Sequence, residues 1–363
     1  MLQPDQALKK APVDAEEMAQ DPRTDTHVDD LRYKIDPAQL VLELPRLSIK
    51  DFSGEDFSGM SLAGADFSGA DLSGVNFSDA SLMGADLSGA DLYKANLKGA
   101  RLAGANLENA DLSMADLSEC SLAGASLQGI KLSGACLVGV RLSGARLAGA
   151  DLYEADLSMA VLAGADLRKA NLSMATMVGT DLTGAKLQYA RMVMVNLTDA
   201  TLCNAKLNGA HITDSTLVGA ALCRADATHC DLSGSDMSNT KLWWTHLFKT
   251  NLAGTNMTNA LLTETNMSLA QIEGAILTHT GLTQDEATRR FQGLSYDETT
   301  VWDYPERSDE GEESIVTDVT QPKKSRKKFP KSLRKSAHKK AGRPVRTASC
   351  PVDATLAVSG ARS

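Results

Sequence analysis

The chain has 363 residues, a formal net charge of −9 and only 4% aromatic residues. The acidic balance argues against the basic class of nucleic-acid-binding protein, and the six cysteines lack the spacing of a zinc site. The sequence has no apolar stretch of about 18 residues, which a membrane span would need, and no apolar segment near residue 1 of the kind found in secretory signals. We therefore expect a cytoplasmic protein, with delivery to a host cell left open.

The first 50 residues are charged and contain five of the ten prolines, whereas residues 51–282 contain none. A proline-free stretch of that length indicates that almost every backbone N–H is used. Residues 1–35 are predicted to be disordered. Residues 36–50 are predicted to form an N-terminal cap, in which Asp36 precedes Pro37 as at the start of a short helix; an extended strand is the alternative.

A five-residue register runs through residues 51–282 without insertion or deletion. Taking every fifth residue from 52 to 282 gives 47 positions, of which 35 are Leu, five Met, four Phe and two Ile. The residue two positions earlier is Ala at 29 of the 47 sites, and the typical unit is Ala-Asp/Asn-Leu-Ser-Gly. Neither the helical period of 3.6 nor the strand period of 2 explains this spacing.

This register resembles that of the pentapeptide repeat family, and the resemblance covers about two-thirds of the chain. It implies an all-β solenoid, a right-handed quadrilateral β-helix of about twelve coils over 51–282, with helical end caps and a disordered tail. Four pentapeptides would make one square coil, with Leu and Ala inside and with neighbouring coils about 4.8 Å apart. At five inward positions Thr replaces Ala near the end of the register, and each hydroxyl is expected to bond a backbone carbonyl.

Residues 20 apart share a side of such a coil, so the register sorts the outer surface. On the side that begins at Phe52, the residue before the core position is Asp at six of twelve sites. We call Asp51, Asp71, Asp91, Asp111 and Asp151 the acidic column. On the same side, Lys131 and Arg191 stand at positions where the pattern would place Asp. The acidic column predicts either a solvated polar face or, because some relatives present an acidic rod of duplex-like width to DNA gyrase, a DNA mimic.

The side that begins at Leu62 is almost free of acidic residues and carries bulky apolar residues at one place. Cys223 and Trp243 are predicted to face outward there, with Trp244 at the adjoining corner and Phe248 on the next side. These four residues are the candidate interface. Exposed aromatic groups of this kind mark a contact with a protein partner or a second copy of the chain. The alternative is that a C-terminal helix or Trp302 folds back over them.

After the register, Thr283 and Glu286 form a capping box, which predicts a C-terminal helix from about 284 to 292 within a capping segment 283–300. Residues 301–363 are predicted to be a disordered tail, first acidic and then basic. Residues 321–346 contain twelve Lys or Arg and no acid. The basic residues that would contact nucleic acid or an anionic membrane are Lys323, Lys324, Arg326, Lys327, Lys328, Arg334, Lys335, Lys339 and Lys340.

No catalytic constellation emerges from the register, and we expect no enzyme activity, cofactor, metal site or small-molecule substrate. Three functions remain open at this point. The first is a non-enzymatic scaffold or interaction rod that binds a macromolecular partner through its outer faces and tail. The second is an acidic DNA mimic that modulates a topoisomerase such as DNA gyrase, and the third is an effector or nucleic-acid-associated protein that uses the basic tail.

Overall fold

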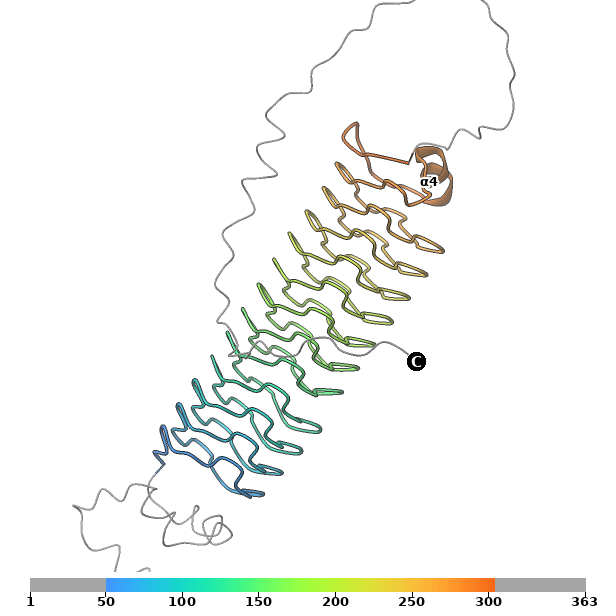
Figure 1. Ribbon diagram of the computed structural model, residues 1–363. Helices are drawn as coiled ribbons and strands as arrows, with labels where there is room; N and C mark the ends of the chain where they lie inside the picture. Colours follow the sequence, from blue (N-terminus) through green and yellow to red (C-terminus); the bar gives the residue numbers. More distant parts are fainter. Residues whose placement is uncertain (1–49, 304–363) are drawn as a thin grey trace, which may run out of the picture.

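A computed structural model describes residues 50–303, which form one rod of stacked coils (Figure 1). Parallel β-bridges join each residue that precedes a core position to the residue 20 positions later, from Asp51 with Asp71 to Asn256 with Ile276. Because 20 residues contain four five-residue units, each coil has four sides. We name the sides by their first core residues: side 1 begins at Phe52, side 2 at Phe57, side 3 at Leu62 and side 4 at Phe67.

One unit shows why the repeat uses these residue types. The Leu72 side chain is fully buried. The Ser73 amide donates to Asp71 Oδ1 at 3.0 Å, which closes a local turn around the buried residue. The next residue, Gly74, has φ of +66°, a left-handed conformation that glycine adopts without steric cost. The chain then turns onto the next side, where the Val75 amide donates to the Leu72 carbonyl at 3.1 Å.

Successive coils are joined by backbone hydrogen bonds on every side. The Leu72 amide donates to the Asp91 carbonyl at 2.7 Å, and the Gly74 amide donates to the Tyr93 carbonyl at 2.8 Å. The Asp91 amide donates back to the Ala70 carbonyl at 2.9 Å. This use of nearly every amide explains the absence of proline from the register.

The core is a continuous column of buried Leu and Ala side chains that runs the length of the rod. At its first coils Phe residues replace Leu, and their rings contact one another, with centroids 5.4 Å apart for Phe57 and Phe77. Near the other end the Thr hydroxyls bond backbone carbonyls, as predicted. The hydroxyls of Thr245 and Thr250, for example, each donate at 2.8 Å, to the carbonyls of Leu222 and Ala227.

The ladder is interrupted between the coil at 122–130 and the coil at 141–149. Four amides there make no backbone hydrogen bond although their equivalents in adjacent coils do, namely Gly124, Leu127, Gly129 and Arg146. The bond from the Asp151 amide to the Ile130 carbonyl is long, at 3.4 Å. Ile130 stands at an inward position between Ala110 and Ala150, and we infer that its larger side chain holds the two coils apart.

The helix α4, Gln284–Arg290, lies at the end of the rod (Figure 1). The Thr283 hydroxyl caps it by accepting a hydrogen bond from the Glu286 amide at 3.3 Å. The helix was expected from about 284 to 292 and ends at Arg290, and the chain beyond it returns to the ladder. Ser295 pairs with Gln271 and Val301 with Ile276, so these residues extend the coil stack instead.

The predicted disordered segment 1–35, most of the predicted cap 36–50 and all but the first residues of the predicted tail lie outside the described residues. The basic residues from Lys323 to Lys340 are among them. Within residues 50–303, no helix has the length and apolar character needed to cross a bilayer.

Candidate functional site

The acidic column on side 1 is a true stack in its first four coils. Asp51, Asp71, Asp91 and Asp111 pair successively through parallel bridges. Lys131 follows them, and its Nζ lies 3.0 Å from Asp111 Oδ2. Asp151 is therefore separated from the other four, and the Asn171 side-chain amide donates to it at 3.0 Å.

Local hydrogen bonds stabilise the ionised carboxylates of this column. The backbone amide of Ser53 lowers the pKa of Asp51 below its ordinary value. Burial opposes ionisation of Asp111, but hydrogen bonds from Ser113 and Lys131 outweigh it and lower the pKa of Asp111 as well. Asp51 and Asp111 thus stay charged at neutral pH.

The charge of the rod changes along its axis, which the sorting by sides does not reveal. Residues 50–120 contain 12 acidic and four basic residues. Residues 121–230 contain eight acidic and nine basic residues. Residues 231–303 contain nine acidic and four basic residues. The rod is therefore acidic at both ends, most strongly at the N-terminal end, and close to neutral between them.

The predicted interface residues gather on side 3 and on the corner between sides 3 and 4. Trp243 is 36% exposed and Trp244 is 48% exposed. Phe248 is half-buried on side 4, and Cys223 is half-buried one coil below Trp243. Trp302 does not cover them, since it packs edge-on against Tyr296 with ring centroids 5.3 Å apart.

Two cations lie over the rings of this cluster. The Arg224 guanidinium is 5.4 Å from the centre of the Trp244 ring, and Lys249 Nζ is 5.4 Å from the centre of the Phe248 ring. Such contacts orient the aromatic side chains at a solvent-exposed site. The sequence analysis did not identify these basic partners, although Lys249 directly follows Phe248 and Arg224 precedes Trp244 by 20 residues at the same corner.

Trp244 adopts an uncommon backbone conformation. Its φ is +56°, in the left-handed region that bulky residues rarely occupy. Nothing in the packing of the core requires an indole at this corner, because the Trp244 side chain projects from the rod. The same left-handed corner holds other large residues, such as Tyr189 and Leu269, so the fold tolerates a large side chain at this position.

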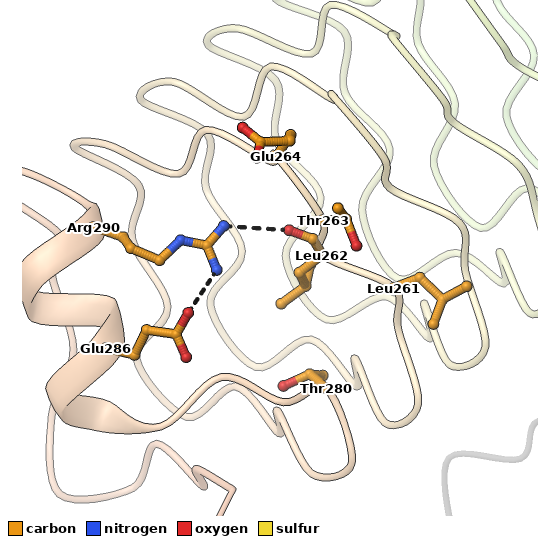
Figure 2. Close-up of a pocket in the computed structure, with 7 residues that line it drawn as sticks. All are labelled: Leu261, Leu262, Thr263, Glu264, Thr280, Glu286 and Arg290. Atoms are coloured by element: carbon orange, nitrogen blue, oxygen red, sulfur yellow. Dashed lines mark hydrogen bonds and ion pairs between the residues drawn. The ribbon is translucent and has the colours of Figure 1, made fainter.

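A pocket of about 450 Å³ opens between α4 and the last regular coil, a feature that the sequence did not predict. Figure 2 shows Arg290 reaching from α4 across it, with hydrogen bonds to Glu286 at 3.0 Å and to the Leu262 carbonyl at 3.5 Å. The backbone amides of Leu262 and Glu264 find no acceptor among the described residues. The pocket exists because the chain forms α4 here in place of a further coil side, which would otherwise cover the edge at Leu262 and Glu264.

The described part of the chain offers no group of three or more His, Cys, Asp or Glu residues arranged to hold a metal ion. Two of its cysteines, Cys120 and Cys230, are buried, and burial raises the pKa of Cys120 to about 12 and that of Cys230 also upward. Burial also raises the pKa of the Cys223 thiol, with a contribution from its neighbour Cys203. These thiols are therefore protonated at neutral pH and poor nucleophiles.

Comparison with known proteins finds one family. The family model described as "Pentapeptide repeats (8 copies)" matches a series of overlapping segments, from residues 51–79 at one end to residues 244–278 at the other. A search of curated protein sequences found no match.

Several solved structures are similar to this chain. One is HetL from the cyanobacterium Nostoc sp. strain PCC 7120, a pentapeptide repeat protein involved in heterocyst differentiation regulation, with 28% identity, coverage of 65% of this chain and 94% of HetL, and a TM-score of 0.27. Another is trypsin-treated QnrB1, a plasmid-mediated fluoroquinolone resistance protein, with 17% identity, coverage of 59% and 90%, and a TM-score of 0.33. A pentapeptide repeat protein from the Arabidopsis thaliana thylakoid lumen has 28% identity, coverage of 42% and 69%, and a TM-score of 0.13.

Proposed function

The chain belongs to the pentapeptide repeat family, whose members fold as right-handed quadrilateral β-helices, and on that premise we propose that it is a non-enzymatic interaction rod that binds a protein partner through Trp243 and Trp244. The observation that carries this proposal is the exposure of two adjacent indoles, Trp243 and Trp244, in a chain that has only three Trp residues. Trp is the residue most enriched at the energetic centres of protein interfaces.

The surroundings of the two indoles support the proposal. Side 3 lacks the stacked carboxylates of side 1, so an apolar partner surface can approach without desolvating a column of charges. Leu261, which pairs with Lys241 one coil below it, is 43% exposed and extends the apolar surface beside Trp243. A flat β-face that carries rigid aromatic anchors is well suited to bind a protein surface.

The proposal predicts that Trp244→Gly removes partner binding without unfolding the rod. Glycine fits the left-handed corner, so the lost cation–π contact and the relieved backbone should leave the free energy of unfolding within about 1 kcal/mol of the parent. The matched control is Tyr189→Gly, since Tyr189 is 65% exposed and also sits at a left-handed corner, with φ of +60°. Affinity capture from the native cell, with urea unfolding of each variant, makes the measurement.

The expected result is that the parent and Tyr189→Gly retain the same co-purifying protein and that Trp244→Gly loses it. Retention of that protein by all three chains would contradict the proposal. A large fall in the stability of Trp244→Gly alone would instead assign the indole a structural role.

A second candidate function is a DNA mimic that acts on a topoisomerase such as DNA gyrase. The observation that favours it is the stack of Asp51, Asp71, Asp91 and Asp111 in the most acidic third of the rod. Carboxylates about 4.8 Å apart repel one another, so a cationic partner groove that neutralises them would gain free energy.

The mimic predicts that the double variant Asp71→Asn, Asp91→Asn loses any effect on gyrase supercoiling. Asn fits this position without disturbing the fold, because Asn76 accepts the same turn hydrogen bond from the Ser78 amide at 3.1 Å. The control is Asp231→Asn on the same side at the far end of the rod. No effect of the parent protein on supercoiling, even at high micromolar concentration, would exclude this function.

A further inference from the structure

We propose that the acidic segment 304–318 of the same chain docks on the surface formed by Arg224, Lys241, Trp243, Trp244, Phe248 and Lys249, and that it competes there with the protein partner. We call these six residues the aromatic–basic surface. The inference rests on the proposed function, because it describes how the same site is regulated.

The cations of the aromatic–basic surface have no carboxylate partner within the described residues. The ion pairs found between 50 and 303 involve Lys131, Arg168 and Arg290, and none involves Arg224, Lys241 or Lys249. Above and below Lys241 on side 3, the paired residues are Leu261 and Ala221, neither of which is charged. The surface therefore presents unneutralised positive charge beside exposed rings.

Two acidic residues border the surface. Glu264 stands one coil above Trp244 at the same corner and, within the described chain, forms no ion pair with Arg224, Lys241 or Lys249. The second, Asp226 on side 4, is already engaged. Asp226 accepts hydrogen bonds from the Thr228 amide at 3.1 Å and from the Thr228 hydroxyl at 2.6 Å. Such a carboxylate is held in its own turn and does not reach across to the cations. An acidic peptide can thus pair with Arg224, Lys241 and Lys249 without displacing an existing salt bridge.

The last described residue leaves the rod next to this surface. The Asp303 carboxylate accepts a hydrogen bond from the Gly281 amide at 2.6 Å and another from the His279 amide. Both amides lie at the corner where side 2 ends and side 3 begins, in the coil that follows Leu261. The described chain therefore ends, at Asp303, at the edge of the side that carries Trp243.

The distance to the surface is short for an extended chain. Trp243 lies two coils below residue 283 in the register, which corresponds to about 10 Å at a coil spacing of about 4.8 Å. An extended chain covers about 3.3–3.6 Å per residue, so a few residues after Asp303 are enough to reach it. No rearrangement of the rod is needed.

The composition of the segment complements the surface. Residues 304–318 read YPERSDEGEESIVTD and contain six acidic residues and one Arg. The cluster from Asp309 to Glu313 has four carboxylates in five residues, and Ile315 and Val316 follow it as apolar groups that can contact the rings. Because the segment is tethered to the same rod, its effective concentration at the surface is high even if each ion pair is weak.

Quenching of tryptophan fluorescence in the full chain tests this proposal. A Trp302→Phe background leaves Trp243 and Trp244 as the only emitters, since the chain has three Trp residues. In that background the segment is neutralised by five substitutions, Glu306→Gln, Asp309→Asn, Glu310→Gln, Glu312→Gln and Glu313→Gln. A matched control replaces five residues of the basic region with Gln, namely Lys323, Lys324, Arg326, Lys327 and Lys328.

We expect acrylamide to quench the emission at least about twofold more effectively when the acidic segment is neutralised, because charge pairing no longer holds it over the rings. The basic-region control should match the parent. In the parent, adding about 0.5 M NaCl should raise quenching toward the level of the neutralised chain, whereas that chain should respond little.

Equal quenching in the parent and the neutralised chain would overturn the proposal. Protection of the rings that increases with protein concentration would also overturn it, since a second copy would then cover the surface. Neither outcome depends on the partner: if Trp244→Gly still loses the captured protein while quenching is unchanged, the proposed function stands and the regulatory segment fails. If quenching responds as expected but Trp244→Gly keeps its partner, docking of the acidic segment stands and the proposed function fails.

Discussion

Replacing Leu222 with Asp should lower the free energy of unfolding by about 4 kcal/mol or more. Leu222 is fully buried, and the residues that stack on it, Leu202 and Leu242, are fully buried too. A carboxylate at this position would lose its hydration and find no cation inside the column, which is among the most costly single changes in a protein core. Because each coil contacts only its neighbours, we expect urea unfolding to split into separate transitions for the two halves of the rod.

The matched control is Leu261→Asp, which makes the same chemical change at an outward position. Leu261 is 43% exposed, and its bridge partner in the preceding coil is Lys241. A carboxylate there stays hydrated beside a cation, so stability should change by no more than about 0.5 kcal/mol. Similar losses for Leu222→Asp and Leu261→Asp would contradict the inward and outward assignment of the register.

Replacing Ile130 with Ala should close the interruption of the ladder. The amides of Leu127 and Arg146 lack acceptors in the parent, whereas the Leu107 amide one coil earlier donates to the Ser126 carbonyl at 2.8 Å. Hydrogen exchange at Leu127 and Arg146 should therefore be fast in the parent and slow by about tenfold or more in Ile130→Ala. Amide-resolved hydrogen exchange by NMR makes this measurement.

The reverse change supplies the control. Ala150 occupies the equivalent inward position one coil later, next to the Leu147 amide, which donates to the Asp166 carbonyl at 2.8 Å. Ala150→Ile should open a second interruption and speed exchange at Leu147. If Leu127 exchanges as slowly as Leu107 in the parent, the size of Ile130 is not what separates the coils.

The architecture was predictable because the repeat is strictly local. An Asp or Asn that closes a turn, a buried Leu and a corner that favours Gly act within five residues, so the pattern is visible without any long-range contact. The same register correctly placed Leu and Ala inside and Trp243 and Trp244 outside. It also correctly predicted that the inward Thr hydroxyls bond backbone carbonyls, because a buried hydroxyl has few other partners.

The end of the rod was harder to predict. The capping box at Thr283 indicated where α4 begins, but nothing local to residues 291–303 indicated that they rejoin the ladder. Their pairing with Gln271 and Ile276 is decided by the open edge of the preceding coil, which offers unsatisfied hydrogen-bonding groups to any chain that can reach it. The capping segment 283–300 therefore contains one short helix, and its later residues extend the coil stack.

The sequence by itself determined the five-residue step, the buried column and which residues face water, because each of these follows from chemistry repeated inside every unit. Only the tertiary structure decided the interruption beside Ile130, the pocket under α4 and the placing of Arg224 over Trp244. Each of those depends on the contact between one coil and a neighbouring coil of different sequence. A small difference in side-chain volume, or a missing coil side, changes the structure only where coils stack on one another. The regular positions built the rod, and its departures from regularity created the surfaces at which it is proposed to act.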